Sequence, residues 1–481
     1  MRIRPSLPLL SLAWALVPVG TLAAQDTPFR WSVQDEAHGS LALPSGHTGN
    51  RGGWTSVPDS GFLYRWVPTF SGDPTVEVLF RAPASGHPSL PERVLVQFPA
   101  DFTERPFAER ALVLAFHSFG VSEKDIFVNT ELPVLCRKRG WMLVAPYGLT
   151  DTSFANVQAQ ASLETVLRAI YAEIPFNYRR IYSVGFSMGG LGALSFAARH
   201  RDPRGVRVAG VIFHTGPLDV AALYEDSVLS VKLLLADPAH FGATPSADPF
   251  AYERVSPVRW DAAGNVDPGH APVVHLEGLP VFLHTNLADP SADLVQGVLE
   301  LQTFLIGRGA EVYSHVVFDP DGGHNWLTLP MSEALDTVGQ SVLGAPAPRL
   351  EIFADRPVPY GAAEVRALPW DTHAHLVLDL AADGPQAENG FALEDTRDLE
   401  EVAVNTKLAG LDPRAVLRFR WSSADGTGDR VVLTDYVSPP RGVELDGVPA
   451  PVGSWSWSAV HEELSVQLPA DGLTHHVTVL P

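Results

Sequence analysis

The sequence predicts an α/β protein: a mostly parallel sheet with helices on both faces, preceded by a short β extension and followed by a β-sandwich-like domain. Between about residues 91 and 345, apolar strand-like runs alternate with amphipathic helical stretches, which is typical of a parallel sheet covered on both faces. A linker-like Gly-Ala-Pro-Ala-Pro run at residues 344–348 leads into β-rich sequence. The length of 481 residues also exceeds what one ordinary core supports.

Composition excludes several classes of partner and site. The formal net charge is −21, with 34 Lys and Arg against 55 Asp and Glu, so the chain would repel a nucleic-acid backbone. The single cysteine, Cys136, excludes an intramolecular disulfide and any multi-cysteine metal site. Its apolar neighbours predict a buried position.

The N-terminus is typical of a secretory signal peptide, predicted over residues 1–24. Arg2 and Arg4 precede an apolar stretch at residues 7–22, and Ala23 and Ala24 supply a small-residue cleavage site. The stretch is short for a membrane span, and the rest of the sequence offers no other candidate. We therefore expect a secreted or periplasmic protein with no integral membrane segment after the signal is removed.

The elements follow in order. Residues 25–90 are predicted to form a β-rich N-terminal extension, residues 91–345 the α/β domain, and residues 349–481 the C-terminal β-rich domain. The strands expected in and just before the α/β domain are 75–80, 94–98, 111–116, 141–145, 181–184, 209–213, 281–284 and 311–318, with helices at 159–173 and 294–308. Residues 217–278 exceed what one crossover needs, and they predict a cap-like insertion with a helical run at 220–235. The C-terminal strands are expected at 350–353, 375–380, 416–421, 430–433 and 464–468.

One segment of the α/β domain carries a nucleophile motif. Residues 185–189 read Gly-Phe-Ser-Met-Gly, directly after the strand at 181–184 and before a small-residue helical stretch at 191–198. Strand, sharp turn and helix are the context that a G-x-S-x-G nucleophile elbow requires, with Ser187 as the nucleophile. The flanking glycines leave room for the tight turn.

The acid and histidine that such a nucleophile needs follow in the expected order. Asp289 lies in the loop after the strand at 281–284, where a triad acid belongs, and His324 lies in a Gly-rich loop after the last strand. Asp293, four residues beyond Asp289, is the competing acid, although it is expected inside the next helix. The order and spacing predict a Ser187–His324–Asp289 triad.

An oxyanion hole needs two backbone N–H groups near the nucleophile. One is expected from Met188, the residue after it, and the other from the loop that follows the strand at 111–116, at Ser118 or Phe119.

Taken together, residues 91–330 resemble the α/β-hydrolase superfamily. The most similar group is the secreted esterases that include esterase D, feruloyl and acetylxylan esterases and polyhydroxybutyrate depolymerases. Residues 177–182, Asn-Tyr-Arg-Arg-Ile-Tyr, and 322–326, Gly-Gly-His-Asn-Trp, are similar to that group's approach to the elbow and to its histidine loop. Ser118 stands where that group commonly has glycine. The resemblance implies an ester substrate, with polysaccharides and polyesters among the polymeric candidates.

The predicted function is therefore a serine esterase that works through an acyl-enzyme, a chemistry that requires no metal and no cofactor. Two alternatives stay open: a prolyl-oligopeptidase-type peptidase, disfavoured because no long propeller precedes the catalytic domain, and a non-catalytic envelope or binding protein that keeps the fold. His373 and His375 lie in the other domain and are expected on its surface rather than as metal ligands. The acyl and alcohol specificity, the role of the C-terminal domain and the oligomeric state do not follow from the sequence.

Overall fold

The computed structural model describes residues 55–56, 62–67, 74–203, 205–344, 347–369, 371–380 and 389–481. The expected signal peptide lies outside these residues. Among the residues that are described, no helix combines the length and the apolar character that a membrane crossing needs.

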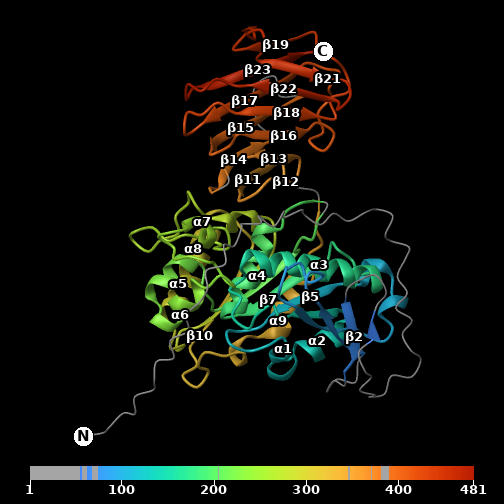
Figure 1. Ribbon diagram of the computed structural model, residues 1–481, viewed down its shortest axis with the longest axis vertical. Helices are drawn as coiled ribbons and strands as arrows, with labels where there is room; N and C mark the ends of the chain where they lie inside the picture. The colour runs from blue at the N-terminus through green and yellow to red at the C-terminus, as the bar shows by residue number, and fades with distance from the viewer. Residues whose placement is uncertain are drawn as a thin grey trace.

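A ten-stranded sheet forms the centre of the larger unit (Figure 1). In spatial order its strands are β1 (Thr55–Ser56), β2 (Phe62–Trp66), β3 (Thr75–Phe80), β4 (Glu92–Gln97), β6 (Met142–Pro146), β5 (Leu112–Phe116), β7 (Ile181–Phe186), β8 (Gly210–His214), β9 (Val281–Asn286) and β10 (Val312–Val317). The strands from β6 to β10 pair in parallel, whereas β1 to β4 pair antiparallel with one another and β4 pairs antiparallel with β6. The expected N-terminal β extension is thus continuous with the main sheet.

Helices cover both faces of this sheet. They are α1 (Lys124–Asn129), α2 (Leu132–Arg139), α3 (Val157–Glu173), α4 (Met188–Arg199), α8 (Ala292–Gly307) and α9 (Met331–Val338), with short 3-10 turns η2 (Phe102–Glu104), η3 (Phe107–Glu109) and η5 (Trp326–Thr328). In Figure 1, α3 and α4 lie on the side toward the C-terminal sheets, and α1, α2 and α9 lie on the opposite side. The central strands are apolar on both faces because both are buried: Leu112, Val113 and Leu114 of β5 have no exposed surface. Cys136 is also fully buried, as predicted.

The segment between β8 and β9 folds into α5 (Val220–Asp226), α6 (Leu229–Leu235), α7 (Pro249–Glu253) and η4 (Pro272–Leu276). The single helical run expected over residues 220–235 is wrong in one respect, because Ser227 and Val228 adopt extended backbone and divide it into two helices. A small core around the fully buried Tyr252 holds these helices against Met188 and Leu191 of α4. The insertion therefore packs next to the start of the helix that follows Ser187.

The C-terminal residues form two stacked sheets. One contains β11 (Arg349–Ala354), β14 (Ala374–Asp379), β15 (Gly390–Arg397), β17 (Leu417–Ser423), β23 (Thr474–Leu480), β19 (Gly442–Leu445) and β20 (Val448–Pro449). The other contains β12 (Val358–Tyr360), β13 (Ala363–Ala367), β16 (Glu401–Asn405), β18 (Arg430–Thr434), β22 (Glu463–Gln467) and β21 (Trp455–Ser458). Their inner faces share one core around Trp421, whose indole N–H donates to Asp429 Oδ2 at 2.8 Å. The predicted fold class, with its added β-sandwich, is confirmed.

A seam of buried polar contacts joins the sandwich to α4. The Arg199 guanidinium at the end of α4 forms an ion pair with Asp355, which also accepts from Arg254 Nε at 3.0 Å. The His275 ring bridges the two units: Nδ1 lies 2.7 Å from the Ala198 carbonyl oxygen, and Nε2 accepts from the Phe353 N–H at 2.8 Å. The sandwich is therefore fixed to the helix that follows Ser187.

Candidate active site

Ser187 occupies a strained turn between β7 and α4. Its backbone has φ 57° and ψ −127°, a conformation that is rarely adopted by residues with a side chain. A Cβ atom on Gly185 would lie 1.9 Å from the Gly189 carbonyl oxygen, and one on Gly189 would lie 2.2 Å from that of Phe116. Both glycines of the motif are therefore required by close backbone packing, as the sequence predicts for an elbow.

The structure brings Ser187, His324 and Asp289 together. Ser187 Oγ lies 2.9 Å from His324 Nε2, and His324 Nδ1 lies 2.7 Å from Asp289 Oδ2. A carboxylate can only accept, so Nδ1 carries the proton and Nε2 is free to accept from the serine hydroxyl. The Asp289 side chain is 1% exposed. The competing acid, Asp293, lies in the first turn of α8 and lines a neighbouring cleft instead.

The expected oxyanion donors come from two adjacent segments. Met188 is the first residue of α4, so its N–H has no partner within the helix. Ser118 and Phe119 follow β5, and their loop is held in place because the Ser118 carbonyl oxygen lies 2.8 Å from His117 Nδ1. The loop starts against α4, since the Gly189 Cβ position is 2.7 Å from the His117 carbonyl oxygen. Met188 thus offers an N–H without a partner inside its helix, and the loop that carries Ser118 and Phe119 starts against the first turn of the same helix.

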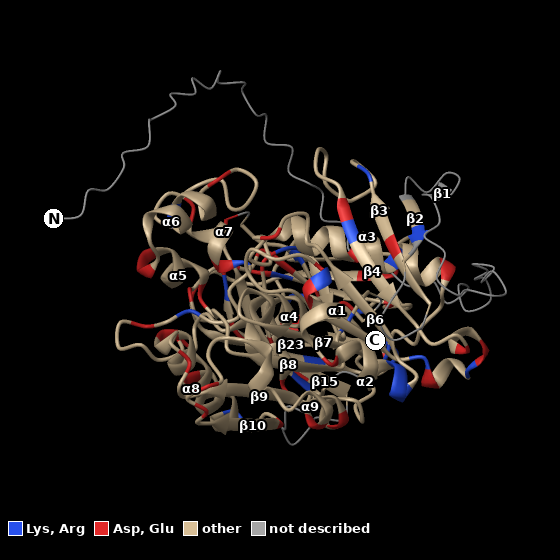
Figure 2. Cartoon of the chain, turned by 90° about the horizontal axis from the view of Figure 1, so that it is seen from below, with Lys and Arg blue, Asp and Glu red and all other residues tan. Residues whose placement is uncertain are grey.

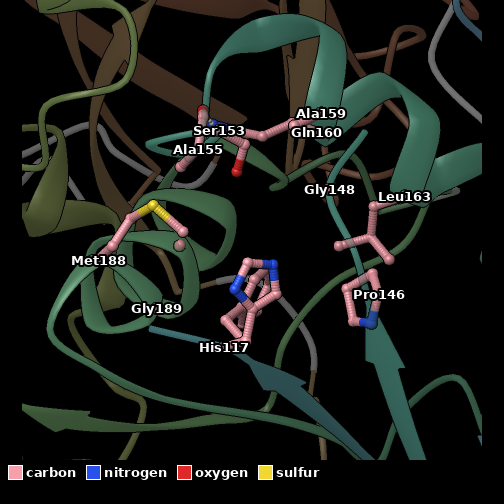
Figure 3. Close-up of a pocket in the computed structure, with 12 residues that line it drawn as sticks. His117, Pro146, Gly148, Ser153, Ala155, Ala159, Gln160, Leu163, Met188 and Gly189 are labelled. Atoms are coloured by element: carbon pink, nitrogen blue, oxygen red, sulfur yellow. Dashed lines mark hydrogen bonds between the residues drawn. The ribbon is translucent and has the colours of Figure 1, made fainter. Parts of the chain in front are cut away.

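A small cavity lies behind these donors (Figure 3). Its volume is about 30 Å³. His117, Met188, Ser153 and Gln160 are among the residues that line it. We assign it no part in substrate binding.

The aromatic ring of Phe186 packs against the His324 imidazole. The Phe186 ring lies 4.4 Å from it between centroids, and Phe186 also contacts Trp326 at 5.5 Å. The Trp326 indole N–H donates to Asp125 Oδ2 of α1 at 3.2 Å. The residue before the nucleophile therefore packs against the imidazole, and Trp326 packs against that residue.

Three histidines that were not predicted from the sequence form a row beneath the loop of His324. His214, His284 and His315 pair side by side on β8, β9 and β10. Their strands share a Val-x-x-His pattern, at residues 211–214, 281–284 and 312–315, and this repeat is the signal that could have revealed the row.

Two of these histidines support the loop that carries His324. His214 Nε2 lies 2.8 Å from the Asn325 carbonyl oxygen, and His284 Nε2 lies 3.0 Å from Thr328 Oγ1. Burial lowers the pKa of His214 to about 4 and that of His284 to about 3, so both rings are neutral near pH 7. A neutral His214 donates its one N–H to the carbonyl next to His324.

A cleft of about 680 Å³ opens beside the triad, between the insertion and α8. Two residues of its lining adjoin the site: Gly216 packs against the Ser187 carbonyl, and Pro290 follows Asp289. Its acidic lining residues are Asp219, Asp226, Asp293 and Glu300, and Trp260 adds an aromatic surface. No Lys or Arg is found among the described residues of the lining, and Figure 2 shows acidic positions on α5 and α8. The cleft therefore favours neutral or cationic ligands.

The expectation that His373 and His375 lie on the surface is wrong. His375 is 7% exposed, with Nε2 3.2 Å from Glu351 Oε1. His373 lies at the seam, where its ring meets those of Phe250 and His270. Alternation along a strand cannot show that a second unit covers its outward face.

No model of a known protein family matches this sequence, and no curated protein matches it. Solved structures that are similar include a ferulic acid esterase, at 13% identity and a TM-score of 0.40 over 55% of this chain and 98% of that chain. An S-formylglutathione hydrolase from Agrobacterium tumefaciens matches at 11% identity and a TM-score of 0.40, over 60% of this chain and 100% of that chain. An acetyl xylan esterase from Paenibacillus sp. R4 matches at 10% identity and a TM-score of 0.39, over 60% and 88%. Because these values are low, the assignment of the α/β-hydrolase fold rests on the strand order and the elbow, which agree with the sequence-based resemblance.

Proposed function

We propose that this chain is a secreted serine hydrolase that cleaves carboxylic esters through an acyl-enzyme. The observation that carries the proposal is the unbroken chain of hydrogen bonds from the Ser187 hydroxyl through His324 to the buried Asp289 carboxylate. It starts at a strained elbow that holds the hydroxyl at the N-terminus of α4. Strain of this kind persists where the surrounding structure enforces it, and it is concentrated at functional sites.

Each group has a role in the proposed reaction. His324 Nε2 takes the Ser187 proton while Oγ attacks the ester carbonyl carbon, and Asp289 stabilises the imidazolium that forms. The N–H of Met188 and that of Ser118 or Phe119 would bind the tetrahedral oxyanion. Collapse breaks the bond to the alkoxy group, which leaves as the alcohol with the proton from His324. Water then attacks the acyl-serine by the same route and releases the carboxylic acid.

The cleft supports a neutral ester as the substrate. Its acidic lining would repel an anionic acyl or alcohol group, whereas Trp260 offers a flat surface to a sugar ring or an apolar chain. An open cleft of this size can hold part of a polymer, so a neutral polysaccharide ester or a polyester is the proposed natural substrate class. Export to the periplasm or the medium is part of the proposal and is checked by N-terminal sequencing of the mature protein.

A fluorophosphonate probe tests the nucleophile directly. We expect the probe to label one residue, Ser187, and the label to vanish in Ser187→Ala. Ser456→Ala, which removes an exposed hydroxyl in the sandwich, serves as the matched control and should label fully. Absence of labelling in a folded wild-type protein would instead support the non-catalytic alternative.

An ester panel then tests the substrate class. It runs from acetyl to long-chain and feruloyl esters and includes p-nitrophenyl hydrogen succinate as an anionic member. We expect neutral esters to react faster than the succinate at equal chain length. Cleavage of peptidyl nitroanilides without any ester hydrolysis would reverse the ranking in favour of a peptidase.

A further inference from the structure

Three side chains with metal-binding chemistry meet at the seam between the α/β unit and the sandwich. Glu253 ends α7, His270 precedes η4, and His373 precedes β14 of the sandwich. One ligand atom from each lies within 4.8 Å of those of the other two. In Figure 1, α7 lies next to the end of the sandwich that carries β11 and β12. The cluster therefore draws its members from both units.

The two histidines each present a buried nitrogen with no protein partner. His270 Nε2 and His373 Nδ1 are both shielded from solvent and accept or donate no hydrogen bond to any described residue. The His270 ring as a whole is 8% exposed, and it is oriented by a hydrogen bond to the backbone of Glu253. A buried polar atom without a partner carries a free-energy cost of about 1–3 kcal/mol unless another group satisfies it. Both unpartnered nitrogens belong to histidines that share a 4.8 Å cluster with the Glu253 carboxylate, and this combination points to a ligand shared by the three side chains.

We propose that Glu253, His270 and His373 bind a divalent transition-metal ion of the zinc type, which links the catalytic unit to the sandwich. Two imidazole nitrogens and one carboxylate oxygen are a common protein ligand set for zinc, with water in the fourth position. Calcium and magnesium prefer oxygen ligands, so this donor set disfavours them.

The spacing suits an ion after a small adjustment. Ligand atoms bound at about 2.0–2.2 Å around a tetrahedral ion lie about 3.4 Å apart. The three atoms need to approach one another by little more than about 1 Å, which side-chain rotation provides. The hydrogen bond from the His270 ring to the Glu253 backbone is the kind of contact that orients a metal-binding imidazole.

The surrounding charges are compatible with binding. Arg259 donates to Glu253 Oε1 at 2.8 Å, but its side chain is 53% exposed and can turn into solvent when an ion takes its place. Arg254 and Arg199, the other cations near His373, are paired with Asp355.

The ion would have a structural role. None of its three ligands belongs to the Ser187 site, and their positions on two units predict that binding favours one relative placement of the units. A ligand that binds only the folded state at 100 times its Kd lowers the unfolding equilibrium constant about 100-fold. We therefore expect metal to raise the Tm and to leave ester hydrolysis unchanged within about twofold.

The test uses the tag-free full-length protein after treatment with a chelator. Zn²⁺ is returned by dialysis, metal content is measured by mass spectrometry, and Tm is measured with and without the ion. Co²⁺ provides an independent signal, since histidine and carboxylate ligands give it visible absorption bands. We expect one ion per chain, a higher Tm, and at least tenfold weaker binding in Glu253→Gln and in His373→Asn. His476→Ala, which removes an exposed histidine of the sandwich, should bind like the wild type.

Two results would overturn the proposal. One is a folded wild-type protein that takes up no Zn²⁺ or Co²⁺ above background and whose Tm does not respond to either. The other is stoichiometric binding that survives both substitutions. Should a variant fail to fold, the Tm and Co²⁺ spectrum of the wild-type protein still decide the matter. Labelling of Ser187 by fluorophosphonate is measured on the same samples, so failure of the metal site and failure of the proposed esterase are separate outcomes.

Discussion

The triad and the seam both depend on histidines, but the chain assembles them in different ways. His324 and Asp289 follow neighbouring parallel strands, and Ser187 follows a third, so all three lie at one edge of a single sheet. His270 and His373 meet only because two separately folded units pack against each other. A site built on one sheet edge is encoded by the order of its motifs, whereas a site at a seam depends on how whole units dock.

The polar side chains of the two regions also differ in their exposure to solvent. His324 keeps 26% of its side chain exposed to solvent. At the seam, the side chains of Arg199 and Asp355 are only 5% and 4% exposed, and they satisfy each other. Exposure fits a group that exchanges protons with a substrate, and burial with pairing fits a group that holds two units together.

The largest effect is expected at the triad. Asp289→Asn would replace an acceptor by an amide and favour the wrong tautomer of His324, so ester kcat should fall by about 10⁴-fold while the Tm stays close to that of the wild type. Asp293→Asn, the matched control four residues away, should change kcat by less than about threefold. Steady-state kinetics on a p-nitrophenyl ester measures both. A larger loss in Asp293→Asn than in Asp289→Asn would transfer the role of the acid to Asp293.

The catalytic residues could be predicted from the sequence because each lies in a loop directly after a strand. The elbow glycines, Ser187 and the loops of Asp289 and His324 could be placed because parallel strands fix where each loop emerges. The sandwich could be anticipated from alternating residues after the linker. The seam could not, because the burial of His373 depends on contacts with Phe250 and His270 that are distant in sequence. The Val-x-x-His repeat under the His324 loop is present in the sequence. Only the strand order shows that its three histidines lie side by side.

A substitution at the seam should lower the free energy of unfolding and leave the rate of ester hydrolysis almost unchanged. Although burial alone would raise it, the charges of Arg199 and Arg254 hold the pKa of Asp355 well below its usual value. Asp355→Asn would leave buried guanidinium groups without their carboxylate, which typically costs about 3–5 kcal/mol. Urea denaturation should show this loss, while kcat per labelled Ser187 changes little. Asp101→Asn, which breaks the exposed Arg105–Asp101 pair, should cost less than about 1 kcal/mol. Equal effects of the two substitutions would show that the seam does not hold the units together.

Glu92, a buried acid inside the α/β unit, has a raised pKa, whereas that of Asp355 is lowered. Glu92 accepts from the N–H groups of Tyr147, Gly148 and Leu149, yet burial raises its pKa from 4.5 to about 7. The folded state then binds the proton more tightly than the unfolded state. Its stabilising contribution is fully present below about pH 4.5 and is lost as the pH rises through about 7, a change of about 3 kcal/mol.

Glu92→Gln should remove that dependence. The test compares urea-unfolding free energies of wild type and variant between pH 5 and 8, and the difference between them should shift by a few kcal/mol across this range. Asp355→Asn should show no such trend there, because the wild-type Asp355 stays ionised throughout. Parallel pH profiles for wild type and Glu92→Gln would mean that the three N–H donors keep Glu92 ionised in the folded state.

The smallest effect is expected from His214. This side chain is buried, like the polar groups of the seam, but it contacts the loop that carries His324, so its substitution should change the reaction rate. His214→Leu would remove the donor to the Asn325 carbonyl and let that loop relax, so kcat should fall by about 10- to 100-fold with little change in KM. His214→Gln keeps an N–H that can reach the same carbonyl and should recover most of the rate. The rate of fluorophosphonate labelling should follow kcat in both variants. If the leucine variant loses only stability, with an unchanged kcat per labelled Ser187, then His214 is a core residue and not a positioning residue. A rate recovered by glutamine would instead show that the hydrogen bond, rather than the volume of the ring, keeps His324 in line with Ser187.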